Sequence, residues 1–365
     1  NIFSFGITWQ DKLTFLSECS FKNIFMNNEQ ITPSKNGLKY LERLLLKILE
    51  KRKIKCVMSC GAYYERNKNW EKILNTSKIP MFCLHKESVG LSKNINFITN
   101  KNHYKRLRKF NGNLLFVANH HMKDLLSQIN YFPKDKIKVV GLPKIDNLYN
   151  LKKINSKKNN YKSNNKIVLF SFYHTYLLEE ITFDKGRWSE DGEFGFFNLF
   201  DSVHATVANF AKNNKQSEVI IKLKWKESFW ENKVLEALKK YGLDINRIPN
   251  LTIDYMLDAH NLITSCDTII GFNSTTLTES LFLNKKTIIP CYYEAQTKYS
   301  DYVLWSDNEA FTRVFSENEL YEKLFNKDKF IPKKGNIKKT LEEAFGYVDG
   351  NNTKRLSEQI INYIK

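Results

Sequence analysis

The stretch from residue 267 to residue 293 constrains the fold of this chain more than any other. Its sequence, DTIIGFNSTTLTESLFLNKKTIIPCYY, opens with an apolar, β-branched run at 268–270 that stops at Gly271. Residues that cap helices follow, then leucines at helical spacing, and a second apolar run closes the unit at 287–290. Strand, turn, helix and strand in this order, with both strands apolar throughout, predict a right-handed βαβ crossover in a parallel sheet covered on both faces.

The turn of this unit is a candidate phosphate site. Asn273, Ser274, Thr275 and Thr276 stand where a helix begins, so their side chains accompany backbone N–H groups that have no partner within the helix. Ligands of parallel sheets bind at the carboxyl ends of the strands, and the N-terminus of a helix suits a phosphate oxygen. The alternative is that the hydroxyls only cap the helix and that Glu279 is solvated on its surface.

Residues 271–290, GFNSTTLTESLFLNKKTIIP, resemble the donor-site motif of GT-B glycosyltransferases of bacterial surface-polysaccharide biosynthesis. In that motif a Ser/Thr pair opens a helix that carries a Glu. The segment is also similar to the corresponding stretch of CDP-glycerol glycerophosphotransferases. Residues 139–148, VVGLPKIDNL, resemble the segment that closes the first domain of these transferases. The resemblance implies an α/β fold of the GT-B type, with two Rossmann-like domains, a cleft between them and a C-terminal helical tail.

The rest of the chain alternates strand and helix patterns. In the first half, strands are expected at 2–8, 55–59, 79–84, 114–118 and 137–140, and helices at 37–53, 65–76 and 121–128. In the second half, strands are expected at 167–172, 219–223 and 251–253, and helices at 196–213, 232–241, 256–265, 320–325, 337–345 and 353–364. The helix at 37–53 combines an apolar face with a basic outer face.

A Lys/Asn/Ser-rich segment divides the chain. Residues 151–166 hold almost no apolar surface and a fresh strand follows at once, so we interpret them as an interdomain linker rather than a long loop within one domain. We therefore expect an acceptor domain at 1–150 and a nucleotide-sugar donor domain at 167–345. The resemblance implies that the last helix, within 346–365, packs back on the first domain.

Composition excludes several classes of protein. A chain of 365 residues with 42% hydrophobic and 14% aromatic content can fill two cores and is not disordered. It holds no apolar run of about 18 residues that would span a membrane and no signal-peptide pattern. The six cysteines lack CxxC spacing and predict buried, reduced thiols in a cytosolic protein. Because the chain begins with Asn1 in a strand-like run, we expect further residues before it in the full protein.

The net charge is +18, with 57 Lys and Arg against 39 Asp and Glu. Such an excess favours a polyanionic partner, namely nucleic acid, anionic lipid headgroups or phosphorylated substrates. The Lys- and Asn-rich composition is also what an AT-biased genome encodes. Because no RRM, zinc-finger or KH signature is present, we expect no nucleic-acid partner. An anionic membrane surface remains an expected partner.

Lysines at the end of a second-domain strand form a candidate anion clamp. Lys222 and Lys224 are two residues apart in VIIKLKW, and this spacing places both ammonium groups on one face of a strand. Cations at such a position can stabilise a departing phosphate. The alternative is a pair of solvated lysines. In the resembled families a His-Pro pair follows this strand, whereas this chain has Lys-Trp.

The resemblance implies further donor contacts. His174 stands just after the first strand of the second domain, where such enzymes contact the donor phosphate. His260 lies on the helix before the strand at 268–270. The resembled transferases contact the base and the ribose near this position. Glu279 occupies the position of a Glu that takes the ribose hydroxyls. Each histidine can instead be an ordinary loop or helix residue.

An inverting transfer also needs a general base for the acceptor hydroxyl. The resemblance places it in the first domain, where Glu87 follows the apolar strand at 79–84 and His85 is the second choice. A competing candidate is Asp191 in the segment EDG at 190–192, which is similar to an acidic motif of bacterial sialyltransferases. Each carboxylate can also be a solvated surface group. Because no DxD pattern stands at a strand end, we expect neither a metal nor a cofactor.

The favoured function is an inverting, metal-independent glycosyltransferase. It would move a sugar from a nucleotide-activated donor to a lipid-linked or oligosaccharide acceptor of capsule or lipopolysaccharide, in the cytoplasm at the inner face of the membrane. A transferase of polyol phosphate from CDP-glycerol or CDP-ribitol remains an alternative, although the His-Pro pair and a His-Gly signature are missing. A basic nucleic-acid-binding protein without catalysis is the second alternative.

Overall fold

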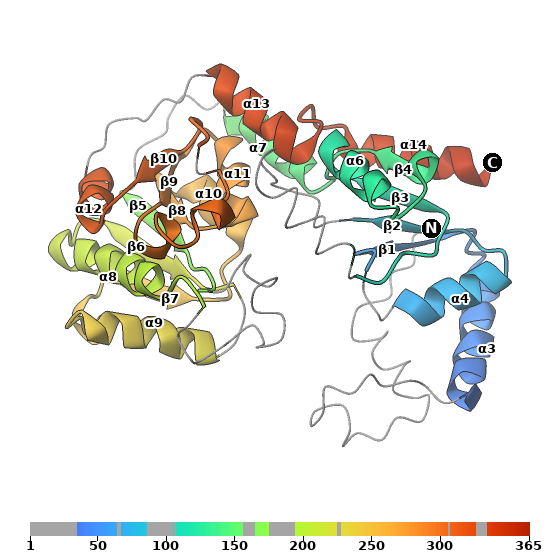
Figure 1. Cartoon of the computed structure of the whole chain (residues 1–365), viewed down its shortest axis with the longest axis horizontal. Helices are drawn as coiled ribbons and strands as arrows, with labels where there is room; N and C mark the ends of the chain where they lie inside the picture. Colours follow the sequence, from blue (N-terminus) through green and yellow to red (C-terminus); the bar gives the residue numbers. More distant parts are fainter. Residues whose placement is uncertain are drawn as a thin grey trace.

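The computed structural model describes residues 35–63, 67–85, 105, 107–155, 165–174, 194–224, 228–305, 307–325 and 334–365. These residues form two α/β domains, each built on a parallel sheet (Figure 1). The expected α/β class and two-domain arrangement are therefore confirmed. The strand expected at 2–8 lies outside the described residues.

The first domain holds a parallel sheet with the strand order β1-β2-β3-β4. Its strands are Val57–Cys60 (β1), Met81–Leu84 (β2), Leu114–Val117 (β3) and Ile137–Val139 (β4), and its helical segments are Lys35–Lys51 (α3), Lys68–Thr76 (α4), His120–Gln128 (α6), Lys134–Lys136 (η2) and Ile145–Asn155 (α7). The elements expected between 37 and 140 are present, with their ends displaced by up to three residues.

The second domain holds a six-stranded parallel sheet with the order β10-β9-β8-β5-β6-β7. Its strands are Lys166–Phe170 (β5), Glu218–Lys222 (β6), Leu251–Asp254 (β7), Thr268–Gly271 (β8), Lys286–Pro290 (β9) and Thr312–Val314 (β10). Its helices are Phe197–Asn213 (α8), Ser228–Lys240 (α9), Ala259–Ser265 (α10), Thr275–Leu281 (α11), Glu317–Phe325 (α12) and Lys334–Phe345 (α13), with short turns at Ile245–Arg247 (η3), Tyr293–Ala295 (η4) and Ser300–Tyr302 (η5). The stretch at 267–293 forms β8, α11 and β9, as predicted.

Among the described residues, one α-helix and one strand were not predicted. Helix α7 begins inside VVGLPKIDNL and continues through residues 151–155, so the first third of the expected linker is helical. Its anchoring side chains, Ile145 and Leu148, are buried and precede the polar segment that suggested a linker. Strand β10 has only three residues, too few for a periodic pattern to reveal it.

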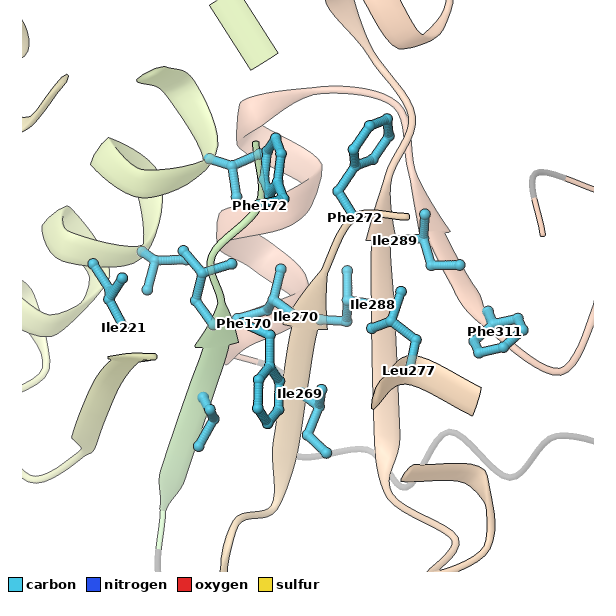
Figure 2. Packing of buried hydrophobic residues seen from close by; sticks show 14 of the residues in the cluster. Phe170, Phe172, Ile221, Ile269, Ile270, Phe272, Leu277, Ile288, Ile289 and Phe311 are labelled. Atoms are coloured by element: carbon cyan, nitrogen blue, oxygen red, sulfur yellow. The ribbon is translucent and has the colours of Figure 1, made fainter. Parts of the chain in front are cut away.

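The core of the second domain follows from its apolar strands. Ile269 and Ile270 of β8 are both fully buried although they point to opposite faces, because helices cover both sides of the sheet. Figure 2 shows these side chains packed with Ile288 of β9 and Leu277 of α11. A Cβ at Gly271 would lie 3.0 Å from the Leu277 side chain, so the glycine lets α11 pack closely against β8.

The last helix, Asn352–Ile364 (α14), runs back along the first domain (Figure 1). Leu356 packs with Phe82 and Phe116, which face away from the side of the sheet covered by α3, α4 and α6. The Tyr363 ring meets the Phe82 ring edge to face at 5.2 Å, and its hydroxyl accepts a hydrogen bond from the Asn113 side chain. The C-terminal helix thus supplies core contacts that the first sheet needs on its second face.

Two side chains of the first domain bind the C-terminal segment, from the end of α13 to the start of α14, where it crosses from the second domain to the first. The Asp146 carboxylate accepts hydrogen bonds from the backbone N–H groups of Asn352 (3.0 Å) and Thr353 (2.8 Å), and so caps the start of α14. Asn119 caps the start of α6, while its amide donates to the carbonyl of Ala344 at the end of α13 (2.9 Å). Neither tertiary cap has a local sequence signature.

Cysteine burial is only partly as expected. Cys83, Cys266 and Cys291 are buried, and burial raises the pKa of each thiol to about 12. Cys56 is half-buried and Cys60 is exposed, because β1 forms the edge of the described sheet. All five are unpaired. Among the described helices, none has the length and apolar character required to cross a membrane.

Candidate functional site

A side-chain contact at the domain junction joins segments that follow the carboxyl ends of one strand from each sheet. Lys144 follows the carboxyl end of β4, and Glu279 lies on α11, which follows the carboxyl end of β8. The Lys144 Nζ atom is 2.5 Å from Oε1 of Glu279. Ligands of open parallel sheets bind at this edge, so the junction is the candidate site.

Glu279 is the buried centre of this site. Its side chain is 3% exposed, and its second oxygen lies 3.2 Å from Nε2 of His260 at the start of α10. Lys144 and His260 are themselves 45% and 28% exposed. The carboxylate therefore holds two positively charged or protonatable side chains from different domains, and both keep surface available to a ligand.

The electrostatics of the trio follow from burial and charge. Burial alone would raise the pKa of Glu279, but the hydrogen bond with His260 and the charge of Lys144 outweigh it and lower the pKa. The hydrogen bond with Glu279 raises the pKa of His260. The stabilisation from His260 is thus complete below its ordinary pKa and is lost as pH rises through the raised value. That from Glu279 is complete above its ordinary pKa and is lost as pH falls through the lowered one.

The start of α11 has the predicted arrangement of hydroxyls. Ser274 is the N-cap residue and accepts a hydrogen bond from the backbone N–H of Thr276 (3.3 Å). The hydroxyl oxygens of Ser274 and Thr276 are 2.6 Å apart. Both residues and Thr275 are half-buried, at the start of the helix that carries Glu279. The capping role of Ser274 is therefore real, and a phosphate role for the three remains a prediction.

Asn273 is oriented differently. Its amide donates to the carbonyl of Tyr302 (2.9 Å) and its side-chain oxygen accepts from the N–H of Leu304 (2.8 Å). The residue has a φ of 49°, a left-handed conformation that Asn tolerates better than most residues. Its side chain thus fixes the turn between β8 and α11 against residues 302–304.

The two candidate clamp lysines have different surroundings. Lys222 is buried, and its ammonium donates to the carbonyls of Leu223 (2.5 Å) and Tyr255 (2.8 Å). Burial lowers the pKa of Lys222. Lys224 lies just beyond β6 and is exposed. Of the two, Lys224 is the exposed residue.

His174 lies at the carboxyl edge of β5, as predicted. Its ring stacks on Phe197 with centroids 4.3 Å apart, and burial lowers its pKa to about 4, so it is neutral near pH 7. The preceding turn is fixed by a buried network in which Trp230 donates to Ser171 (2.8 Å) and Ser171 bonds His204 (2.9 Å). This network holds the turn that positions His174, and it was not predicted.

The catalytic candidates are mostly outside the described residues. Glu87 and Asp191 both lie there. His85 is buried directly after β2, where its backbone N–H donates to the carbonyl of Phe116 and its ring meets Tyr63 edge to face at 5.8 Å. Within the described residues, no group of three or more His, Cys, Asp and Glu side chains is arranged to hold a metal. Metal independence remains a prediction.

Lys144 is the site residue that the sequence analysis missed. It stands within VVGLPKIDNL, which was singled out only as a resemblance. A signal was present, because the segment that follows a parallel strand lies at the ligand-binding edge, and Lys144 stands in the segment between β4 and α7. Its pairing with Glu279, 135 residues away, is a tertiary contact.

No protein-family model and no curated protein matches this chain. Solved structures do match. The UDP-GlcNAc 2-epimerase of Neisseria meningitidis bound to UDP-GlcNAc has a TM-score of 0.51 and 16% identity, over 97% of this chain and 89% of that one. The wall teichoic acid polymerase TagF has a TM-score of 0.51 and 12% identity, over 99% of both chains. A putative UDP-N-acetylglucosamine 2-epimerase of Listeria monocytogenes has a TM-score of 0.53 and 11% identity, over 90% and 80%.

At these identities the likeness shows the fold. Two Rossmann-like domains joined through a C-terminal helical crossing define the GT-B class, and this chain has that fold. Function has to be argued from the site.

Proposed function

We propose that this chain is a GT-B glycosyltransferase that moves a sugar from a nucleotide-activated donor to a surface-glycan acceptor, with inversion and without a metal. The observation that carries the proposal is the buried Glu279 carboxylate, which holds Lys144 of one domain beside His260 of the other at the sheet edges. A departing nucleotide phosphate is stabilised by fixed cations and N–H groups of this kind. Inversion, metal independence and the acceptor are carried by the sequence resemblance.

Each side chain has a role in this proposal. Ser274, Thr275 and Thr276 at the start of α11 receive the donor phosphate, with Lys144 and His260 as its positive partners. Glu279 positions these two groups, and its ribose contact stays a prediction because the carboxylate is 3% exposed. His174 and Lys224 border the same sheet edge and complete the donor site. Glu87 remains the favoured base.

The structural neighbours suggest which donor to test first. One epimerase was solved with UDP-GlcNAc, and MnaA of S. aureus was solved with UDP. These descriptions support a uridine nucleotide as the first candidate, and CDP as the second tests the polyol-phosphate alternative. The lipid-linked or oligosaccharide acceptor and the membrane surface are part of the proposal.

The test is a thermal-shift comparison of UDP, CDP, CMP and GDP. One nucleotide is expected to stabilise the protein, by about 2.7 kcal/mol at 100 times its dissociation constant. Thr275→Val removes a hydroxyl at the start of α11 and is expected to weaken binding of that nucleotide about 10- to 100-fold, because a hydrogen bond to a charged group contributes about 1.5–3 kcal/mol. Thr76→Val, at the exposed end of α4, is the matched control. If no nucleotide binds while DNA binds in a salt-dependent manner, the nucleic-acid alternative replaces the proposal.

Glu279→Gln is expected to weaken nucleotide binding about tenfold and to change its pH dependence. In the parent protein, affinity falls as pH rises through the raised pKa of His260, because the imidazole then loses its charge. Without the carboxylate the pKa of His260 is no longer raised by it, so the fall occurs at lower pH. Calorimetry from about pH 5.5 to 8.5 measures both effects, within the range where histidines titrate.

The matched control is Glu236→Gln, which removes an exposed carboxylate paired with Lys233. Comparing the affinities for ribonucleotides and deoxyribonucleotides distinguishes two roles of Glu279, namely binding of the ribose and positioning of Lys144 and His260. If Glu279 binds the ribose, the ratio of the two affinities changes in Glu279→Gln. An unchanged pH profile would show that Glu279 does not act through His260.

A further inference from the structure

A row of positive charge runs along one side of α3. Lys39, Arg43, Lys47 and Lys51 are spaced four residues apart, which places them on one helix face, and all four are exposed. Exposed Lys53 and Lys55 extend the charge beyond the end of the helix. We call the four helical residues the α3 cation row.

No member of the α3 cation row is paired with a carboxylate in the described part of the chain, although Glu42 and Glu50 lie on the same helix. Like charges four apart destabilise an isolated helix, so the row is maintained by packing on the opposite face, where Leu45 and Leu49 are buried in the first-domain core. A row of unpaired cations of this kind fits a polyanionic surface.

Aliphatic side chains border the row on both sides. Helical spacing places Leu46 next to Lys39 and Arg43 on one side, and Leu44 and Ile48 next to Lys47 and Lys51 on the other. The three aliphatic residues are half-buried. A bilayer surface uses both features, since apolar side chains enter the boundary between headgroups and acyl chains while long cations reach the lipid phosphates.

A nucleic acid fits this face less well. Phosphate contacts would use the cations but not the bordering aliphatic residues. Single-stranded nucleic acid also binds through several aromatic side chains interleaved with the cations, whereas α3 contains one aromatic residue, Tyr40. The observations therefore favour lipid over nucleic acid.

We propose that the α3 cation row docks the first domain onto a bilayer surface that contains anionic lipids. Helix α3 lies at the end of the first domain away from the second domain (Figure 1), so docking there leaves the site at the domain junction open. The inference extends the proposed function, because it identifies the surface that would bring an enzyme of this kind to a lipid-linked acceptor. Binding of the α3 cation row to anionic lipids does not depend on nucleotide binding at the candidate site.

The test is vesicle co-sedimentation at about 0.1 M salt, where charges are screened beyond about 10 Å. Vesicles are phosphatidylcholine alone or with about 30% phosphatidylglycerol, and the parent protein is expected to bind only the anionic ones. Each basic residue near such a surface contributes about fivefold in affinity, so K39Q/R43Q/K47Q/K51Q is expected to lose binding by several hundredfold.

The matched control is K212Q/K215Q/K239Q/K339Q, which removes the same charge from exposed positions of the second domain. It is expected to keep nearly full binding. Equal losses in both variants, unchanged binding in the α3 variant, or preferential binding of DNA through the row at the same salt would each overturn the proposal. Unaltered melting temperatures and nucleotide-induced shifts establish that both variants are folded, and a failure of nucleotide binding leaves the vesicle result interpretable.

Discussion

Gly346→Ala is expected to lower the free energy of unfolding by about 3 kcal/mol. Gly346 ends α13 with a φ of +77°, a conformation that costs an L-residue about 1–2 kcal/mol. An added Cβ would lie 2.1 Å from the carbonyl oxygen of Ala118, and this neighbour is backbone that cannot rotate away. Overpacking of this kind costs about 1–3 kcal/mol more. Chemical unfolding followed by circular dichroism measures the loss.

Gly242→Ala is the matched control. Gly242 has a φ of +68°, but a Cβ there would meet no atom within 4 Å. Its substitution is therefore expected to cost only the backbone strain of about 1–2 kcal/mol. The difference between the two losses in free energy of unfolding measures the effect of the close contact between Gly346 and the Ala118 carbonyl. Equal losses would show that the contact with Ala118 has no energetic weight.

Glu87→Gln is expected to reduce sugar transfer by about 10²–10⁴-fold while donor affinity stays nearly intact. Glutamine keeps the size and hydrogen bonding of the side chain but cannot accept the proton of the acceptor hydroxyl. Glu87 follows His85, which stands directly after β2 at the carboxyl edge of the first sheet. Residues that follow β3 and β4 at this edge contact the second domain through Asn119 and Lys144.

Steady-state turnover and calorimetric donor affinity are measured in parallel for this variant. His85→Gln and Asp191→Asn are the comparison variants, because they are the competing candidates for the base. The base is Glu87 if only its substitution removes turnover at unchanged donor affinity. Normal turnover in Glu87→Gln, with the loss in one comparison variant, transfers the role to that residue.

The predicted strands of the second domain were reliable for a physical reason. Strands buried on both faces of a parallel sheet must be apolar throughout, so they stand out as short runs ended by polar or glycine residues. β8 and β9 have this character, and the cap residue Ser274 marks the helix between them. Strand β10 was missed because its three residues are too few to form a pattern. Helix α7 was missed because its buried apolar residues come before 150, and the polar residues beyond 150 suggested a linker.

Some features of the candidate site could be predicted from the sequence, and others depend on tertiary contacts. That hydroxyls begin α11 and that His174 follows β5 are properties of neighbouring residues, and the sequence alone predicts them. Lys222 shows the opposite case, because strand periodicity could not reveal that its ammonium binds the backbone carbonyl of Tyr255. Periodicity specifies a face of an element and contains no information about what packs against that face.

By itself, the sequence determined the alternation of strand and helix, the α/β class and the local chemistry at the start of α11, because these depend on residues a few positions apart. Only the tertiary structure decided that Lys144 pairs with Glu279, that Asp146 caps a helix 206 residues away and that Leu356 of α14 packs with Phe82 and Phe116. These contacts join segments separated by more than a hundred residues. The physical reason is that a buried charge or an open helix end requires a partner, but many side chains along the chain can meet that requirement, and chain topology selects among them.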